Sequence, residues 1–154
     1  MKQPEQLRYL VLAAQREGNR TLTAAFKPLG ISPSQAEAIR IIGEHRLLNL
    51  QGIGELLICE SGTNPSRLID RLVNAGFVAR KASGTDRRQV VLSLTETGKV
   101  TSRNIAAIED RLYQQIDRVA QSSDMAAAIH ALHLLVKGTS AGMSFDKRLL
   151  SSNL

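Results

Sequence analysis

The chain has 154 residues, 43% of them hydrophobic and 22% charged, which fits one globular domain and excludes a disordered chain. Twenty Lys and Arg residues against 14 Asp and Glu residues give a formal net charge of +6, which favours a polyanionic partner such as a nucleic acid or a membrane surface. Aromatic residues make up only 3% of the chain and Trp is absent, which argues against a platform of stacked bases for single strands or RNA.

Targeting and redox signals are few. The longest apolar run, near residues 9–14, is too short to cross a bilayer, and the N-terminus lacks a signal-peptide core. We therefore expect a cytoplasmic protein without a membrane partner. A single cysteine, Cys59, excludes an internal disulfide framework.

The first predicted helix covers residues 5–26. Gly18 and Asn19 interrupt its pattern, so a kink or break is expected there. The apolar residues that follow helical spacing are Leu7, Leu10, Val11, Ala14, Leu22 and Phe26.

A capping box starts the second helix, because Ser32 is followed three residues later by Gln35, with Pro33 at the first helical position. This helix is expected to end near residues 45–48. Its predicted buried stripe consists of Ala36, Ile39, Ile42 and Gly43.

A third helix is expected over residues 50–59, capped by Asn49 and followed by a tight turn at residues 60–63. Gly52 and Gly54 lower its intrinsic helix propensity, so tertiary packing must hold it. Together with the next helix it forms a predicted helix-turn-helix.

The fourth helix is short and amphipathic. Asn64 suits the N-cap, Pro65 the first helical position and Gly76 a left-handed C-terminal stop. Helical spacing places two sets of side chains on opposite faces, namely Leu68, Ile69, Leu72 and Val73 against Ser66, Arg67, Asp70, Arg71 and Asn74.

A two-stranded hairpin is predicted next, with strands at residues 77–79 and 90–94 and a turn at residues 83–86. Between Thr63 and Gln89 six basic residues face two acidic ones, a net charge of +4. A short polar helix followed by an arginine-tipped hairpin suits double-stranded DNA, with the helix in the major groove and arginines on phosphates or in the minor groove. The alternative is a solvated charged face.

The remaining sequence is helical. Thr95 is expected to cap a long helix that ends near Ala120, a last helix covers residues 125–136, and a residual tail carries Phe145, Leu149 and Leu150. Periodicity alone leaves two readings of the terminal helices open, a dimer interface or a helical cap within one subunit.

The residues around the basic segment resemble the MarR-type winged helix-turn-helix regulators. Residues 66–72 and 76–80 are similar to that family's recognition helix and its exit, and residues 86–88 with 92–98 to the second half of its wing signature. The family pattern repeats Asp-x-Arg at the wing tip, whereas residues 83–85 of this chain lack both charged residues of the first copy.

This resemblance implies a mainly α (α+β) fold, a winged helix-turn-helix with N- and C-terminal dimerisation helices. Residues 1–154 would form one domain, with the DNA-binding part at 32–95 and the dimerisation parts at 5–31 and 96–145. The implied function is a ligand-responsive repressor that binds a pseudo-palindromic operator as a homodimer, with half-sites about 10 bp apart. A non-specific architectural DNA-binding protein and a winged-helix module that binds protein are the alternatives.

The candidate DNA contacts lie on the helix, the preceding turn and the hairpin. Ser66 and Arg67 are expected at base edges, and Thr63 and Asn64 at a phosphate near the helix N-terminus. Asp70 is expected to orient an arginine of the helix or wing. The full predicted set is Ser61, Thr63, Asn64, Ser66, Arg67, Arg71, Arg80, Lys81, Arg87 and Arg88.

Other candidate sites are weaker. A small-molecule effector would lie between the terminal helices and the DNA-binding part, and Tyr9, Arg16 and Arg20 are candidates to contact it. No catalytic constellation, cofactor motif or metal-ligand set is found in the sequence, so we expect no enzyme and no cofactor. Cys59 is expected to be an inert, at least half-buried side chain rather than a redox sensor, and His130 and His133 a surface or interface pair rather than metal ligands.

Overall fold

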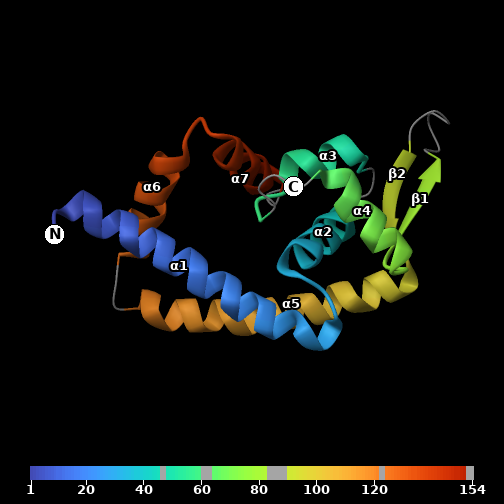
Figure 1. The fold of residues 1–154 in the computed structure, drawn as a ribbon, viewed down its shortest axis with the longest axis horizontal. Helices are drawn as coiled ribbons and strands as arrows, with labels where there is room; N and C mark the ends of the chain where they lie inside the picture. Colours follow the sequence, from blue (N-terminus) through green and yellow to red (C-terminus); the bar gives the residue numbers. More distant parts are fainter. Residues whose placement is uncertain (46–47, 60–63, 83–89, 122–123, 152–154) are drawn as a thin grey trace.

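The computed structural model describes residues 1–45, 48–59, 64–82, 90–121 and 124–151. It confirms a mainly helical chain with a two-stranded hairpin (Figure 1). The elements are α1 (Gln3–Phe26), the 3-10 turn η1 (Lys27–Leu29), α2 (Pro33–Glu44), α3 (Leu50–Leu56), α4 (Pro65–Asn74), β1 (Val78–Ala82), β2 (Val90–Leu94), α5 (Glu96–Ala120), α6 (Met125–Val136) and α7 (Ser140–Ser151).

The first helix is continuous, so the expected break at Gly18 and Asn19 is wrong. One glycine inside a helix costs only about 1 kcal/mol relative to alanine, and the long flanking turns of α1 outweigh that cost. α1 lies beside α5, which is longer by one residue, and the two extend away from the end of the molecule that carries α4 and the hairpin (Figure 1).

The hydrophobic core surrounds α2. Its expected buried stripe is confirmed except for Gly43, which is exposed. The largest side chains buried in this core come from α1, α2, α3, α4, β2 and α5, namely Phe26, Ile39, Ile41, Ile53, Ile69, Leu72, Leu92 and Ile105. Apolar burial therefore joins α2, α3, α4 and the hairpin to the start of α5.

Side-chain caps fix the helix starts as predicted. Ser32 accepts a hydrogen bond from the Gln35 N–H at 3.3 Å, and the Gln35 side chain accepts one from the Ser32 N–H at 2.9 Å. The Asn49 and Thr95 side chains cap α3 and α5 by accepting hydrogen bonds from the Gly52 and Gly98 N–H groups. These caps satisfy amide groups that a helix leaves without partners at its N-terminus.

The third helix is shorter than predicted. It ends at Leu56, and Cys59 is exposed, so the expectation of a helix to residue 59 with a buried or half-buried cysteine is wrong. The Glu37 carboxylate accepts hydrogen bonds from the Ile58 and Cys59 N–H groups, which in a longer helix would bond to backbone carbonyls. A side chain of α2 thus holds the chain where α3 ends.

The hairpin is antiparallel, with Arg80 opposite Leu92, and β1 runs three residues beyond the predicted strand. The Leu92 N–H donates to the Leu48 carbonyl at 2.7 Å, which attaches the hairpin to the segment before α3. At its base a Cβ on Gly98 would lie 2.0 Å from the Phe77 carbonyl oxygen, so this close approach of α5 requires glycine.

The C-terminal tail is a helix, α7, which contradicts the expected residual tail. α7 packs against α3, and its Lys147 ammonium lies 2.8 Å from the Glu55 carboxylate. α6, by contrast, has no buried residue in the described chain although it is mostly apolar. Within the described ranges, no helix combines the length and apolarity that a membrane span requires.

Candidate nucleic-acid interface

Helix α4 presents one polar face to solvent. The Asn64 side chain accepts a hydrogen bond from the Ser66 N–H at 3.0 Å, and Gly76 adopts a left-handed φ of 77° just after the helix, as predicted. Leu68, Ile69 and Leu72 are buried against the core. Consequently the exposed side of α4 consists of polar and basic side chains, among them Arg67 and Arg71.

An ion pair joins α4 to the hairpin. The Arg80 guanidinium on β1 lies 2.5 Å from an oxygen of the Asp70 carboxylate on α4, and both side chains are roughly half exposed. The expectation that Asp70 orients an arginine is confirmed. Lys81 follows on the same strand and is exposed.

The structure brings the described candidates to one end of the molecule, where α4 and the two strands lie together (Figure 1). Six of the predicted DNA contacts belong to the described residues, namely Asn64, Ser66, Arg67, Arg71, Arg80 and Lys81. The other four, Ser61, Thr63, Arg87 and Arg88, lie outside the described residues. An exposed short helix with a basic face beside a hairpin has the width and charge that a major groove accepts.

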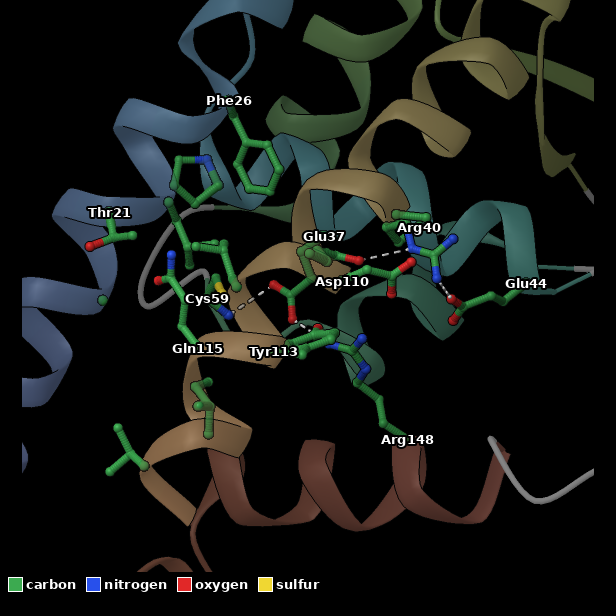
Figure 2. Close-up of a pocket in the computed structure, with 18 of the residues that line it drawn as sticks. Thr21, Phe26, Glu37, Arg40, Glu44, Cys59, Asp110, Tyr113, Gln115 and Arg148 are labelled. Atoms are coloured by element: carbon green, nitrogen blue, oxygen red, sulfur yellow. Dashed lines mark hydrogen bonds and ion pairs between the residues drawn. The ribbon is translucent and has the colours of Figure 1, made fainter. Parts of the chain in front are cut away.

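A cavity of about 740 Å³ lies between α1, α2, α5 and α7 (Figure 2). This volume is within the range of small-molecule sites. Its apolar wall includes Leu22, Phe26, Pro33, Leu112, Ile116, Val119 and Met125, and its charged lining consists of Glu37, Arg40, Glu44, Glu109, Asp110 and Arg148.

Ion pairs organise the charged side of the cavity. The Arg40 guanidinium lies 3.0 Å from the Glu44 carboxylate and 3.2 Å from that of Glu109. Burial raises the pKa of Glu109, against the lowering effect of Arg40. Burial likewise raises the pKa of the Tyr113 hydroxyl, which lies on the same wall.

The three candidate effector contacts lie elsewhere on α1. Tyr9, Arg16 and Arg20 are not among the described residues that line the cavity. Arg8 lies over the Tyr9 ring at 4.1 Å from its centroid, and Arg20 pairs with Glu17 of the same helix. A role for these three residues in effector binding therefore stays a prediction.

Sequence reasoning missed the charged lining of the cavity. Glu37 and Arg40 could have been noticed as charged residues inside the predicted apolar second helix, because charges there need partners. The sequence did not indicate that Arg148 lines a cavity, since this residue lies in the segment that was expected to be a tail.

No metal site is found in the part of the chain that the structure describes, where no group of three or more His, Cys, Asp and Glu side chains could hold an ion. His133 on α6 instead lies 2.7 Å from the Asp146 carboxylate on α7, and its ring is 5.5 Å from that of Phe145. These contacts give His133 a structural role between the two C-terminal helices.

Comparisons with known proteins agree with this geometry. A family model described as a winged helix DNA-binding domain matches residues 31–98. The chain is 35% identical over 98 residues to the organic hydroperoxide resistance transcriptional regulator of Bacillus subtilis (strain 168). That match covers 64% of this chain and 66% of the relative, just under two thirds of its length.

Two solved structures share the fold. The transcriptional repressor CouR, bound to a 23-mer DNA duplex, matches with a TM-score of 0.70 at 23% identity, over 87% of this chain and 94% of that one. A mutant of MarR from E. coli, complexed with operator DNA, matches with a TM-score of 0.68 at 20% identity, over 87% and 94% of the two chains.

Proposed function

The chain belongs to the MarR family of winged helix-turn-helix transcriptional regulators, and on this premise we propose that it represses transcription as a homodimer on a pseudo-palindromic operator, from which an effector releases it. This family consists of regulators rather than enzymes. A cytoplasmic location, where DNA is accessible, is part of the proposal.

The exposed basic face of α4 beside the hairpin carries the proposal. α4 is then the recognition helix and the β1–β2 hairpin the wing. In this proposal Arg67 and Ser66, near the start of α4, contact base edges, and a phosphate binds near the N-terminus of α4, which Asn64 caps. Arg71 on α4 and Lys81 on β1 add positive charge that attracts the phosphate backbone of DNA.

The terminal helices support the homodimer. α6 is mostly apolar but contains no residue of the buried class, and most of its apolar side chains face water, which is unfavourable unless a partner covers them. The first half of α1 is similarly exposed. The exposed apolar side chains of these two segments include Leu7, Leu10, Val11, Leu12, Ile129, Leu132, Leu134 and Leu135. A second copy of the chain offers the same surfaces, and two-fold symmetry would place two recognition helices on successive turns of one DNA face.

The cavity supports the proposal that an effector binds. Its lining includes residues of α1, the helix whose first half belongs to the proposed interface, and of α2, which lies in the DNA-binding part. An occupant could prefer one spacing between the interface and the DNA-binding part over another. It would then shift the equilibrium between DNA-bound and released dimers by the difference between its affinities for the two arrangements. The apolar wall suits an apolar molecule, and the carboxylates opposite it disfavour an anion.

Selection of bound duplexes from a random pool, with competitor DNA at physiological salt, tests the proposal. A pseudo-palindrome with half-sites about one helical turn apart is the expected result. Recovery of DNA without a motif would favour an architectural protein, and recovery of no DNA would favour a winged-helix module that binds protein.

A further inference from the structure

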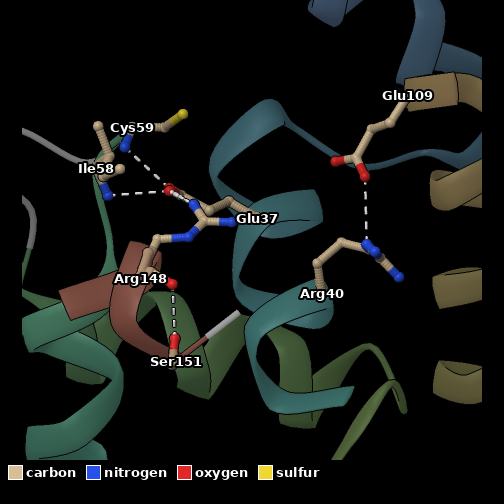
Figure 3. A network of polar contacts seen from close by, with 7 residues as sticks. All are labelled: Glu37, Arg40, Ile58, Cys59, Glu109, Arg148 and Ser151. Carbon is tan, nitrogen blue, oxygen red and sulfur yellow. Dashed lines mark hydrogen bonds and ion pairs between the residues drawn. The ribbon is translucent and has the colours of Figure 1, made fainter. Parts of the chain in front are cut away.

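The buried carboxylate of Glu37 connects three parts of the chain. One of its oxygens accepts a hydrogen bond from the Ile58 N–H at 3.0 Å, and the other accepts one from the Cys59 N–H at 2.9 Å (Figure 3). The Arg148 guanidinium on α7 donates to the first oxygen at 2.8 Å. Glu37 itself is only 7% exposed and lies on α2.

These contacts occur at a point that matters for DNA recognition. Ile58 and Cys59 follow α3 directly, and α4 begins a few residues later, at Pro65. The position of residues 57–59 therefore constrains where the recognition helix starts. A shift of about 1 Å in that start would misplace side chains that must meet base edges within hydrogen-bonding distance.

Arg148 compensates the charge of Glu37. A buried carboxylate is costly unless it is paired and hydrogen-bonded, and charge-assisted hydrogen bonds are roughly twice as strong as neutral ones. The Arg148 side chain is one-third exposed, whereas that of Glu37 is 6% exposed. Among the described residues, loss of the guanidinium would leave the nearly buried charge of Glu37 with the two backbone donors, and its side chain would be drawn towards water.

We propose that Glu37 is a positioning residue for DNA recognition, because it holds the segment before the recognition helix. Arg148, which α7 brings to the DNA-binding part, determines whether Glu37 holds that segment. This inference rests on the proposed function. Glu37, Cys59 and Arg148 also line the cavity (Figure 2), so an occupant that contacts Arg148 would act on the same link.

The test compares Arg148→Ala with Lys147→Ala in the 154-residue chain. Lys147 is a matched control, because it pairs with Glu55 of α3 from the same turn of α7 but does not contact Glu37. Two quantities are measured, the hydrogen-exchange rates of the Ile58 and Cys59 amides and the affinity for the selected operator. Arg148→Lys, which keeps the charge, serves as the conservative variant.

We expect Arg148→Ala to raise exchange at both amides and to weaken operator binding, each by about tenfold, and Arg148→Lys to restore part of both. Lys147→Ala should change neither. Glu37→Gln should act in the same direction as Arg148→Ala, and the double variant should be no worse than the more affected single one, since both changes remove one contact.

A change in operator affinity without faster exchange at Ile58 and Cys59 would overturn the proposal, as would faster exchange without weaker binding. Equal effects of the Arg148 and Lys147 substitutions would also overturn it, because they would mean that α7 stabilises the fold in general and does not act through Glu37. If the wild-type dimer selects no DNA, the proposed function fails, while the exchange rates still decide whether Arg148 holds the segment.

Discussion

Arg80 on β1 and Asp70 on α4 form an ion pair across 2.5 Å, so the first strand of the wing is tied to the recognition helix by side chains as well as by backbone packing. The pair occupies the surface that we assign to DNA, where a carboxylate would repel phosphates unless an arginine accompanied it. The pair therefore acts mainly by orienting Arg80, since exposed ion pairs contribute only about 0–1 kcal/mol to the free energy of unfolding.

Asp70→Asn should release Arg80 from this orientation. We expect the free energy of unfolding to fall by less than about 1 kcal/mol. Affinity for random DNA should rise, because a negative charge is lost from the binding surface, while preference for the operator should fall. Denaturant titration and competition binding measure these quantities. Glu96→Gln, which removes a paired carboxylate from α5, is the control and should leave operator preference unchanged.

Arg67→Ala and Arg88→Ala should separate base contacts from phosphate contacts. Loss of Arg67 should flatten sequence preference at one position of each half-site, at a cost of about 1–3 kcal/mol. Loss of Arg88, which the sequence places in the wing, should weaken all sequences alike and lower the salt slope by about 0.9 per lost phosphate contact. Equal weakening of every sequence by both variants would contradict the assignment.

The features predicted correctly from sequence are those that local chemistry determines. The N-caps at Ser32, Asn49, Asn64 and Thr95 need only neighbouring amides, and the pairing of Asp70 with an arginine needed only the shared basic surface. By contrast, α7 was missed because its anchoring contacts are tertiary, with Arg148 pairing to a residue 111 positions away. For the same reason the early end of α3, which the Glu37 carboxylate sets, could not be read from its own segment.

Glu109 should make stability depend on pH. Burial raises its pKa above the ordinary value of 4.5, so the folded chain binds its proton more tightly than the unfolded chain does. The stabilising effect of the protonated form is complete below 4.5 and is lost as pH rises through the folded pKa. Glu109→Gln should therefore raise the melting temperature at neutral pH, with a gain that vanishes towards pH 4.5.

A carboxylate with the opposite shift provides the control for this pH dependence. Hydrogen bonding to Lys99 lowers the pKa of the exposed Glu96, so its contribution is present above the unfolded pKa and is lost as pH falls through the folded value. Glu96→Gln should lower the melting temperature slightly at neutral pH and have no effect in acid. Gains of the same sign for both variants would contradict the role of burial at Glu109.

The terminal helices should fail to pair when a charge is placed on them. Leu10→Glu on α1 and Leu132→Glu on α6 would each bury an uncompensated carboxylate in the proposed interface, and should weaken dimerisation by at least about tenfold. Light scattering over a concentration series measures the change. Val100→Glu, at an exposed apolar site near the start of α5, is the matched control and should leave the dimer intact.

The lining of the cavity predicts the charge of its occupant. Among the described lining residues, four carboxylates face two guanidinium groups, and both Arg40 and Arg148 already pair with acidic residues of the cavity. An apolar cation would gain Coulomb attraction there, whereas an anion of the same shape would have to break one of these pairs.

Tetraphenylphosphonium and tetraphenylborate have nearly the same size and opposite charge, so calorimetric titration with each isolates this effect. We expect the phosphonium to bind at least about tenfold more tightly, and Glu109→Gln to reduce the difference by removing one carboxylate. Glu96→Gln, which changes the net charge equally but lies outside the cavity lining, should leave the difference as it is. Tighter binding of the borate would show that the two arginines, rather than the surplus of carboxylates, decide what the cavity accepts.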